Sequence, residues 1–184
     1  MPVPEGTIVN LIDTVRMAAD LAEARASGVD FIVACLHWGN EYERRENAGQ
    51  RSLAAFLRRN GVGVVVGSHP HVVQPWRADS SHVVLYSLGN FISAQADRAN
   101  LVGAIAQIEV EKDPSTEKIT IHPPQLQPVI TCYQSGYAQL HLLPFCDYTG
   151  ELGDQRGQPL SRDYIRQLVS SVVDPAFLTG GALD

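Results

Sequence analysis

The alternation of hydrophobic and polar residues predicts two helices in the first third of the chain. Residues 13–26 place their valine, leucine and alanine side chains roughly on one helical face. Residues 48–60 place leucine and phenylalanine on one face and arginine on the opposite face. Gly28 and Gly61 follow the two segments, and glycine is common where a helix ends. We therefore predict one helix in each segment.

Each predicted helix leads into an apolar run that is typical of a strand. Residues 29–39 form a continuous apolar segment, and we expect its strand to end at His37 and to be buried on both faces. Cys35, in the middle of this run, is then a buried thiol that packs like a small hydrophobic residue. Residues 62–67 predict the second strand, in which Gly67 allows a tight turn at the strand end. Helices that alternate with buried strands favour a parallel α/β architecture.

The pattern changes after Trp76 and favours antiparallel strands. Residues 83–87 predict a strand, residues 101–111 predict a longer one, and a hairpin with further short strands follows. Residues 161–173 predict a closing helix, with Ser161 as its N-cap. The fold class is therefore α/β, with parallel strands first, then an antiparallel portion and a closing helix.

Length, composition and charge limit the classes of protein. The 184 residues are 45% hydrophobic and 18% charged, which is typical of one folded domain over residues 1–184. The net charge of −6 argues against nucleic acid as a partner, and an acidic polymer would need a bound cation or a local basic cleft. Residues 1–10 lack the basic and apolar parts of a signal peptide, and we expect neither a leader, an anchor nor a membrane span in this chain.

Two histidine clusters follow the two predicted parallel strands. His37 opens the string HWGNEY, and His69 and His71 lie in the string GSHPH. In open α/β sheets ligands bind at the carboxyl ends of the strands, where these clusters lie. Imidazole suits zinc, iron or manganese, so the histidines are candidate metal ligands, although the spacing alone also fits ordinary surface or core histidines. We expect Pro70 to hold His69 in an extended conformation.

Other polar residues near these histidines are candidates for supporting roles. Glu41 lies four residues after His37 and is a candidate catalytic residue, as a proton donor or as a hydrogen-bonding partner of a ligand. A solvated loop acid is the alternative. Asn90 follows a glycine and is interpreted as a turn residue. Trp38 and Trp76 would either border a cleft beside the histidines or pack in the core.

The block HWGNEY, then Gln50 and Leu53-Ala54, then the blocks GVGVVVGSHPHVVQP and YSLGNF, in this order within residues 29–92, resemble the signature of the CapA family. These proteins are relatives of the calcineurin-like metallophosphoesterases and are linked to bacterial poly-γ-glutamate capsules. The resemblance implies an α/β/β/α sandwich with a two-metal site at the strand ends. It also implies a bacterial source and a location outside the cytoplasm or at the membrane.

The resemblance further assigns metal ligands. In the wider superfamily a late histidine and a following G-H-x-H block close the site, and these positions match His37, His69 and His71. His37 and His69 would hold one metal and His71 the other. The early D-x-H, G-D-x-x-D and G-N-H blocks of the superfamily have no match before His37. The chain therefore resembles the C-terminal, histidine-bearing half of such a domain, and we expect it to bind one divalent metal (Mn, Fe or Zn) weakly, or none.

Three functional hypotheses follow from this resemblance. The first is a metal-dependent, phosphoesterase-like hydrolase that acts on an anionic polymer or a phosphoester in capsule biosynthesis. The second is a non-catalytic component that binds or exports the polymer and has a structural or vestigial metal site. The third is a truncated protein whose exposed sheet edge leads to a dimer or pairs with a missing N-terminal half. The enzyme class stays open at this point.

Overall fold

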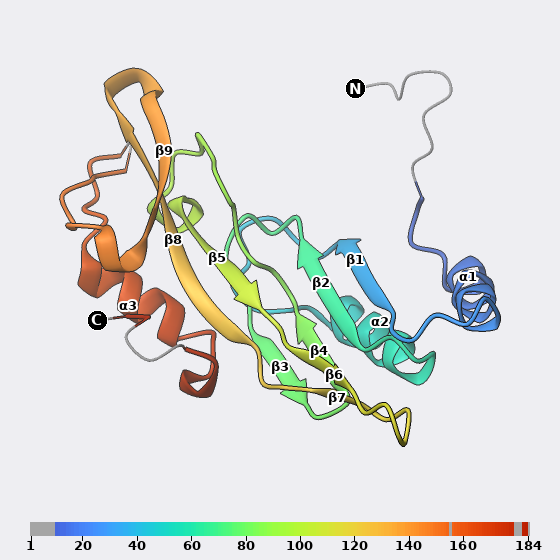
Figure 1. Ribbon diagram of the computed structural model, residues 1–184. Helices are drawn as coiled ribbons and strands as arrows, with labels where there is room; N and C mark the ends of the chain where they lie inside the picture. The colour runs from blue at the N-terminus through green and yellow to red at the C-terminus, as the bar shows by residue number, and fades with distance from the viewer. Residues whose placement is uncertain (1–9, 155, 179–181, 184) are drawn as a thin grey trace.

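The computed structural model describes residues 10–154, 156–178, 182 and 183 (Figure 1). The N-terminal segment considered above for a signal lies almost entirely outside these residues. In the described part of the chain, no helix has both the length and the apolar composition needed to cross a bilayer.

The first part of the chain alternates helices and parallel strands. Helix α1 spans Thr14–Ala26, strand β1 Val33–His37, helix α2 Ala48–Arg59 and strand β2 Val64–Ser68. β1 and β2 pair in parallel. The predicted order of helices and strands is therefore confirmed, because the apolar spacing and the helix ends are local signals.

Strands β1 and β2 belong to a four-stranded sheet with the order β1-β2-β4-β3. Strand β4 spans His82–Leu85 and is parallel to β2, and strand β3 spans Trp76–Asp79 and is antiparallel to β4. The sequence analysis missed β3. Its four residues, WRAD, alternate between apolar and polar, but the run is short, and its alanine and aspartate belong to types that are depleted in strands. Its pairing with β4 is what identifies it as a strand.

The remaining strands are antiparallel, as predicted. Strand β5 spans Val102–Gln107, β8 Gln125–Gln134 and β9 Ala138–Pro144, and they form a sheet in the order β5-β8-β9. A separate hairpin joins β6 (Val110–Lys112) to β7 (Ile119–Ile121). Helix α3 spans Arg162–Ser170, and the Ser161 side chain caps it by accepting a hydrogen bond from the Tyr164 N–H. Short 3-10 helices span Arg98–Leu101, Ser135–Tyr137, Phe145–Asp147 and Pro175–Phe177.

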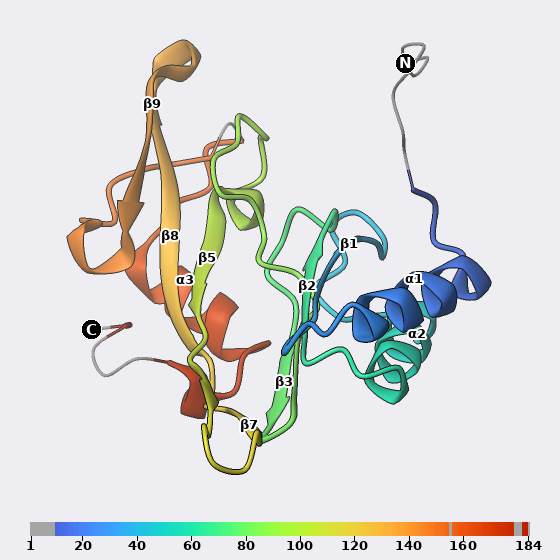
Figure 2. The same cartoon turned by 45° about the vertical axis from the view of Figure 1, so that its right-hand side comes forward.

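The two main sheets are stacked between helices (Figure 2). α1 and α2 cover the outer face of the first sheet, and their Leu21, Leu53 and Leu57 pack with Val65 and Val84 of that sheet. The second core lies between the two sheets and against α3. Its members include Val64, Trp76, Leu85, Val102, Leu126, Ile130, Ile165 and Leu168. This arrangement is an α/β class fold with helices on both outer faces, as expected.

Strand β1 corrects one prediction. It lies at the edge of its sheet and is not buried on both faces, since exposed and half-buried residues alternate along it. Val33 is 52% exposed, and the thiol of Cys35 is exposed and free rather than buried. An apolar run forms a buried strand only where other elements cover it. Among the described residues, β2 alone pairs with β1.

Strand β4 begins with a buried histidine, His82, which is 6% exposed. Its Nδ1 lies 2.8 Å from the carbonyl oxygen of Val62, and its Nε2 has no hydrogen-bond partner among the described residues. Burial is the largest influence and lowers the pKa of His82; Arg58 also lowers it, while the contact with Val62 and the charge of Asp79 raise it. The fold therefore favours the neutral imidazole.

We expect this histidine to weaken the fold in acid. Because the pKa of His82 is lowered from 6.5 on folding, the unfolded chain takes up the proton first as the pH falls through that value. The stabilisation is present above pH 6.5 and is lost below it, with a slope of at most about 1.4 kcal/mol per pH unit for one group. Urea unfolding between about pH 8 and about pH 5 should show a shallower loss for His82→Gln than for the wild type. Equal slopes would contradict the prediction.

Candidate metal centre

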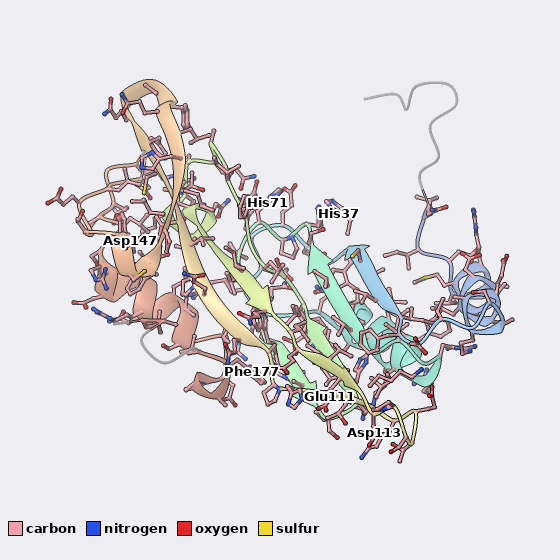
Figure 3. All side chains as sticks on the ribbon, viewed as in Figure 1. His37, His71, Glu111, Asp113, Asp147 and Phe177 are labelled. Atoms are coloured by element: carbon pink, nitrogen blue, oxygen red, sulfur yellow. The ribbon has the colours of Figure 1, made fainter. Side chains whose placement is uncertain are left out.

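The histidines singled out in the sequence lie at one edge of the first sheet. His37 is the last residue of β1, and His69 and His71 follow directly after β2. Because β1 and β2 are parallel and in register up to His37 and Ser68, both carboxyl ends reach the same edge. Figure 3 shows His37 and His71 together beyond the ends of these strands.

The structure gathers one carboxylate with two of these imidazoles. Ligand atoms of Glu41, His69 and His71 all lie within 4.8 Å of one another, and the three residues are exposed or half-buried. The Glu41 Oε1 lies 3.7 Å from the His71 Nε2. His37 is adjacent rather than within this group: its ring centroid is 4.5 Å from that of His69, and its Nδ1 is 3.4 Å from the Ser68 Oγ.

The backbone of the histidine loop differs from the expected extended form. His69 has a φ of 100° and His71 has a φ of 61°, and residues other than glycine rarely adopt such positive φ values. The steric preference imposed by Pro70 is overridden by the surrounding structure, in which the Tyr42 N–H donates to the Pro70 carbonyl at 2.8 Å. Residues held in such conformations cost about 1–3 kcal/mol each and cluster at functional sites. Both residues with this unfavourable backbone conformation have side chains that lie close to Glu41.

Two buried amides hold the loop that carries Glu41. Gln50 on α2 donates from Nε2 to the Gln74 Oε1 at 2.9 Å, and both side chains are almost fully buried. Gln74 in turn donates from Nε2 to the carbonyls of Glu43 and Arg45. Both residues lie in the segments that resemble the family signature, but their structural role was not predicted. The signal available was one amide inside the apolar stretch VVQPW, where an unpaired polar group would be costly.

Asn90 is a third residue whose role in the site the sequence did not show. Its Nδ2 donates to the Gln95 Oε1 and to the Asn100 carbonyl, both at 3.0 Å. With its amide hydrogens used, Asn90 faces His71 with its Oδ1, which accepts a hydrogen bond from the His71 Nδ1–H at 2.9 Å. This contact orients the ring and leaves the Nε2 lone pair of His71 facing Glu41. Asn90 is therefore a partner of the site.

Both tryptophans near the site pack in the core, and although Trp38 also lines a cavity against α2, none of the candidate histidines lines that cavity. Trp38 is 5% exposed and donates from Nε1 to the Tyr86 carbonyl at 2.9 Å. Its ring also stacks on the Tyr86 ring, with centroids 5.7 Å apart. Trp76 is fully buried. Trp38 thus ties the segment after β1 to the segment after β4, below the histidines.

Comparison with known proteins identifies the family. Residues 3–95 match the model of the bacterial capsule synthesis protein PGA_cap family. The PGA biosynthesis protein CapA of Bacillus subtilis (strain 168) is 37% identical over 84 residues, which cover 46% of this chain and 22% of that protein. The capsule biosynthesis protein CapA of Bacillus anthracis is 30% identical over 105 residues, or 57% of this chain and 25% of that protein. The matched segment thus spans a quarter or less of each relative. With half of its length matched and all of the candidate ligands inside the match, the chain belongs to the PGA_cap family of bacterial capsule synthesis proteins.

Proposed function

We propose that this chain carries the histidine part of a metal-dependent hydrolase site that serves capsule biosynthesis. Glu41, His69 and His71 would hold one divalent transition metal, Mn, Fe or Zn, with His37 beside them. The observation that carries the proposal is the convergence of one carboxylate and two imidazoles within 4.8 Å. Nitrogen and oxygen ligands of this kind suit these metals.

The distance between Glu41 and His71 suits two ligands of one cation better than a direct hydrogen bond. The 3.7 Å between the Glu41 Oε1 and the His71 Nε2 exceeds a hydrogen bond. Two ligand atoms that are each about 2.0–2.2 Å from one ion lie about 3–4 Å apart, which matches this separation. The bond from His71 Nδ1 to Asn90 supports the same reading, since metal-binding histidines generally donate their other N–H to an oxygen.

A divalent cation held by Glu41, His69 and His71 would lower the pKa of a bound water molecule and polarise a phosphoryl or carbonyl oxygen. The chain itself contributes orientation and charge. Asn90 holds the His71 ring, and the buried amides hold the Glu41 loop. Because Glu41 is the one carboxylate in the group, a divalent ion there keeps a net positive charge, which would attract an anionic polymer or a phosphoester despite the net charge of −6.

The capsule role stated for the relatives supports poly-γ-glutamate or its precursors as the substrate. The same role supports a location outside the cytoplasm or at the membrane, which we propose for this chain too.

Metal titration of the purified chain tests the proposal. We expect Mn²⁺ or Zn²⁺ to bind with a stoichiometry of about one by calorimetry, and His69→Ala, His71→Ala and Glu41→Gln each to reduce the affinity at least about tenfold, because each removes one ligand. The matched control is His141→Ala, on the exposed strand β9, which should bind like the wild type.

Two results would contradict the metal site. One is a wild-type chain that binds neither ion. The other is wild-type affinity in all three ligand variants. If the site binds metal, hydrolysis of a γ-glutamyl peptide and of a phosphodiester should be compared with the same set of variants, since the site residues alone favour neither bond.

A further inference from the structure

A cavity of about 460 Å³ opens beside the candidate metal centre. Such a volume is within the range of sites for small organic groups. The cavity combines a hydrophobic floor with charged and amide side chains. Its lining includes Tyr42, Arg44, Gln95, Ala96, Ala99 and Arg156.

Two contacts connect this cavity to His71. The ring of Tyr42 stacks on the His71 ring, with centroids 5.9 Å apart. On the other side, Gln95 accepts a hydrogen bond from Asn90, which in turn contacts the His71 Nδ1. The cavity is therefore next to the histidine that Figure 3 labels at the end of β2, and a group bound in it would lie beside the metal centre.

The charge of the cavity is opposite to that of the chain as a whole. Arg44 and Arg156 contribute two guanidinium groups, and Asp97 contributes one carboxylate. Arg156 Nη1 lies 3.5 Å from the Asp97 Oδ2, and both side chains are largely exposed, so this pair is weak. No hydrogen bond or ion pair to another described residue engages the guanidinium of Arg44. A cationic cavity of this kind is what a chain with a net charge of −6 needs to bind an acidic ligand.

Gln95 adds an oriented hydrogen-bond donor. Its Oε1 accepts from the Nδ2 of Asn90 at 3.0 Å and from the Nδ2 of Asn100 at 2.7 Å. Two donors at the oxygen establish which end of the carboxamide faces this network. The Nε2 hydrogens of Gln95 are then available to an acceptor in the cavity that the residue lines.

We propose that this cavity is a subsite for a carboxylate attached to a short aliphatic chain, such as the free α-carboxylate of a γ-linked glutamyl unit with its two methylene groups. Arg44, Arg156 and the Gln95 amide would bind the carboxylate, and the methyl groups of Ala96 and Ala99 would pack against the methylene groups. Guanidinium groups match a carboxylate in charge and geometry. This inference builds on the proposed hydrolase site, because it places an anionic part of the substrate beside His71.

Methyl NMR of the alanine-labelled chain tests the subsite directly. Glutarate, and phosphate in a parallel titration, are added while the methyl signals of Ala96 and Ala99 are followed. We expect saturable shifts with glutarate, and a loss of affinity of about tenfold or more in Arg44→Gln and in Arg156→Gln, the scale for removing a hydrogen bond to a charged group. Arg16→Gln on helix α1 is the control and should leave glutarate binding unchanged.

Each outcome bears on the proposal. No shift of either methyl with glutarate, or unchanged affinity in both arginine variants, would overturn it. Tighter binding of phosphate than of glutarate would overturn the carboxylate assignment and point to a phosphoester substrate. His71→Ala separates the two proposals, because it should lose metal and keep glutarate binding. A chain that binds glutarate but no metal would leave the subsite standing and refute the metal centre.

Discussion

Replacing Gly67 with alanine should destabilise the protein by about 3 kcal/mol or more, the upper range for overpacking a core. A Cβ at this position would lie 2.0 Å from the Tyr86 carbonyl oxygen and 2.4 Å from the Trp38 Nε1. Neither atom can move away easily, since the same two groups are joined by a hydrogen bond. The clash lies in strand β2, directly before the histidine loop, so loss of packing there should also disorder the candidate site.

Urea unfolding of Gly67→Ala beside the wild type measures this effect. Gly153→Ala is the matched control, because a Cβ there would meet only the Gln158 carbonyl at an ordinary 3.7 Å. We expect the control to unfold within about 1 kcal/mol of the wild type. A Gly67→Ala protein of wild-type stability would show that β2, Trp38 and Tyr86 do not pack as closely as the structure has them.

Replacing Asn90 with alanine should weaken metal binding about 10- to 100-fold, the usual cost of losing the hydrogen-bond partner of a metal-binding histidine. The reason is the bond from the His71 Nδ1 to the Asn90 Oδ1, which holds the ring with Nε2 facing Glu41. Without that acceptor the ring is free to rotate and to shift its proton to Nε2, the nitrogen that a metal would need.

Two measurements separate positioning from a general loss of structure. Nitrogen-15 NMR of the metal-free protein should report the Nδ1–H tautomer of His71 in the wild type and a mixture in Asn90→Ala. Asn90→Asp keeps an acceptor for His71 but loses the donors to Gln95 and Asn100. It should therefore be less stable than the wild type yet bind metal better than Asn90→Ala. If both variants bind metal like the wild type, Asn90 has only a structural role.

Much of the architecture could be predicted from short-range patterns. The helix over 13–26 was correct to one residue, and Ser161 was confirmed as the cap of α3, because helical spacing and capping depend on neighbours within one or two turns. The histidines were correctly placed at the ends of two strands for the same reason. The family could also be recognised from the sequence, since each of its signature blocks is a short continuous stretch of the chain.

Burial and backbone conformation at the edge of the sheet could not be predicted from short-range patterns. The run around Cys35 is apolar enough for a buried strand, yet its exposure depends on which strand lies beside it, and β1 is at an edge. His69 was expected to be extended because it precedes a proline, but it has a φ of 100° in a loop whose Pro70 carbonyl accepts a hydrogen bond from the Tyr42 N–H. Gly67 was expected to allow a turn, whereas its actual constraint is the close approach of Trp38 and Tyr86.

The partners of the candidate site depend on contacts between distant parts of the chain. Gln50 meets Gln74 only because α2 packs beside the strand ends, and Asn90 meets His71 only because the segment after β4 returns to β2. Arg44 and Arg156 are over a hundred residues apart and line one cavity. Short stretches of the amino-acid sequence determine the residue types and the ends of the strands, which is why the candidate ligands could be named from the sequence. Their hydrogen-bond partners and the charge around them arise from long-range packing, which no local pattern encodes.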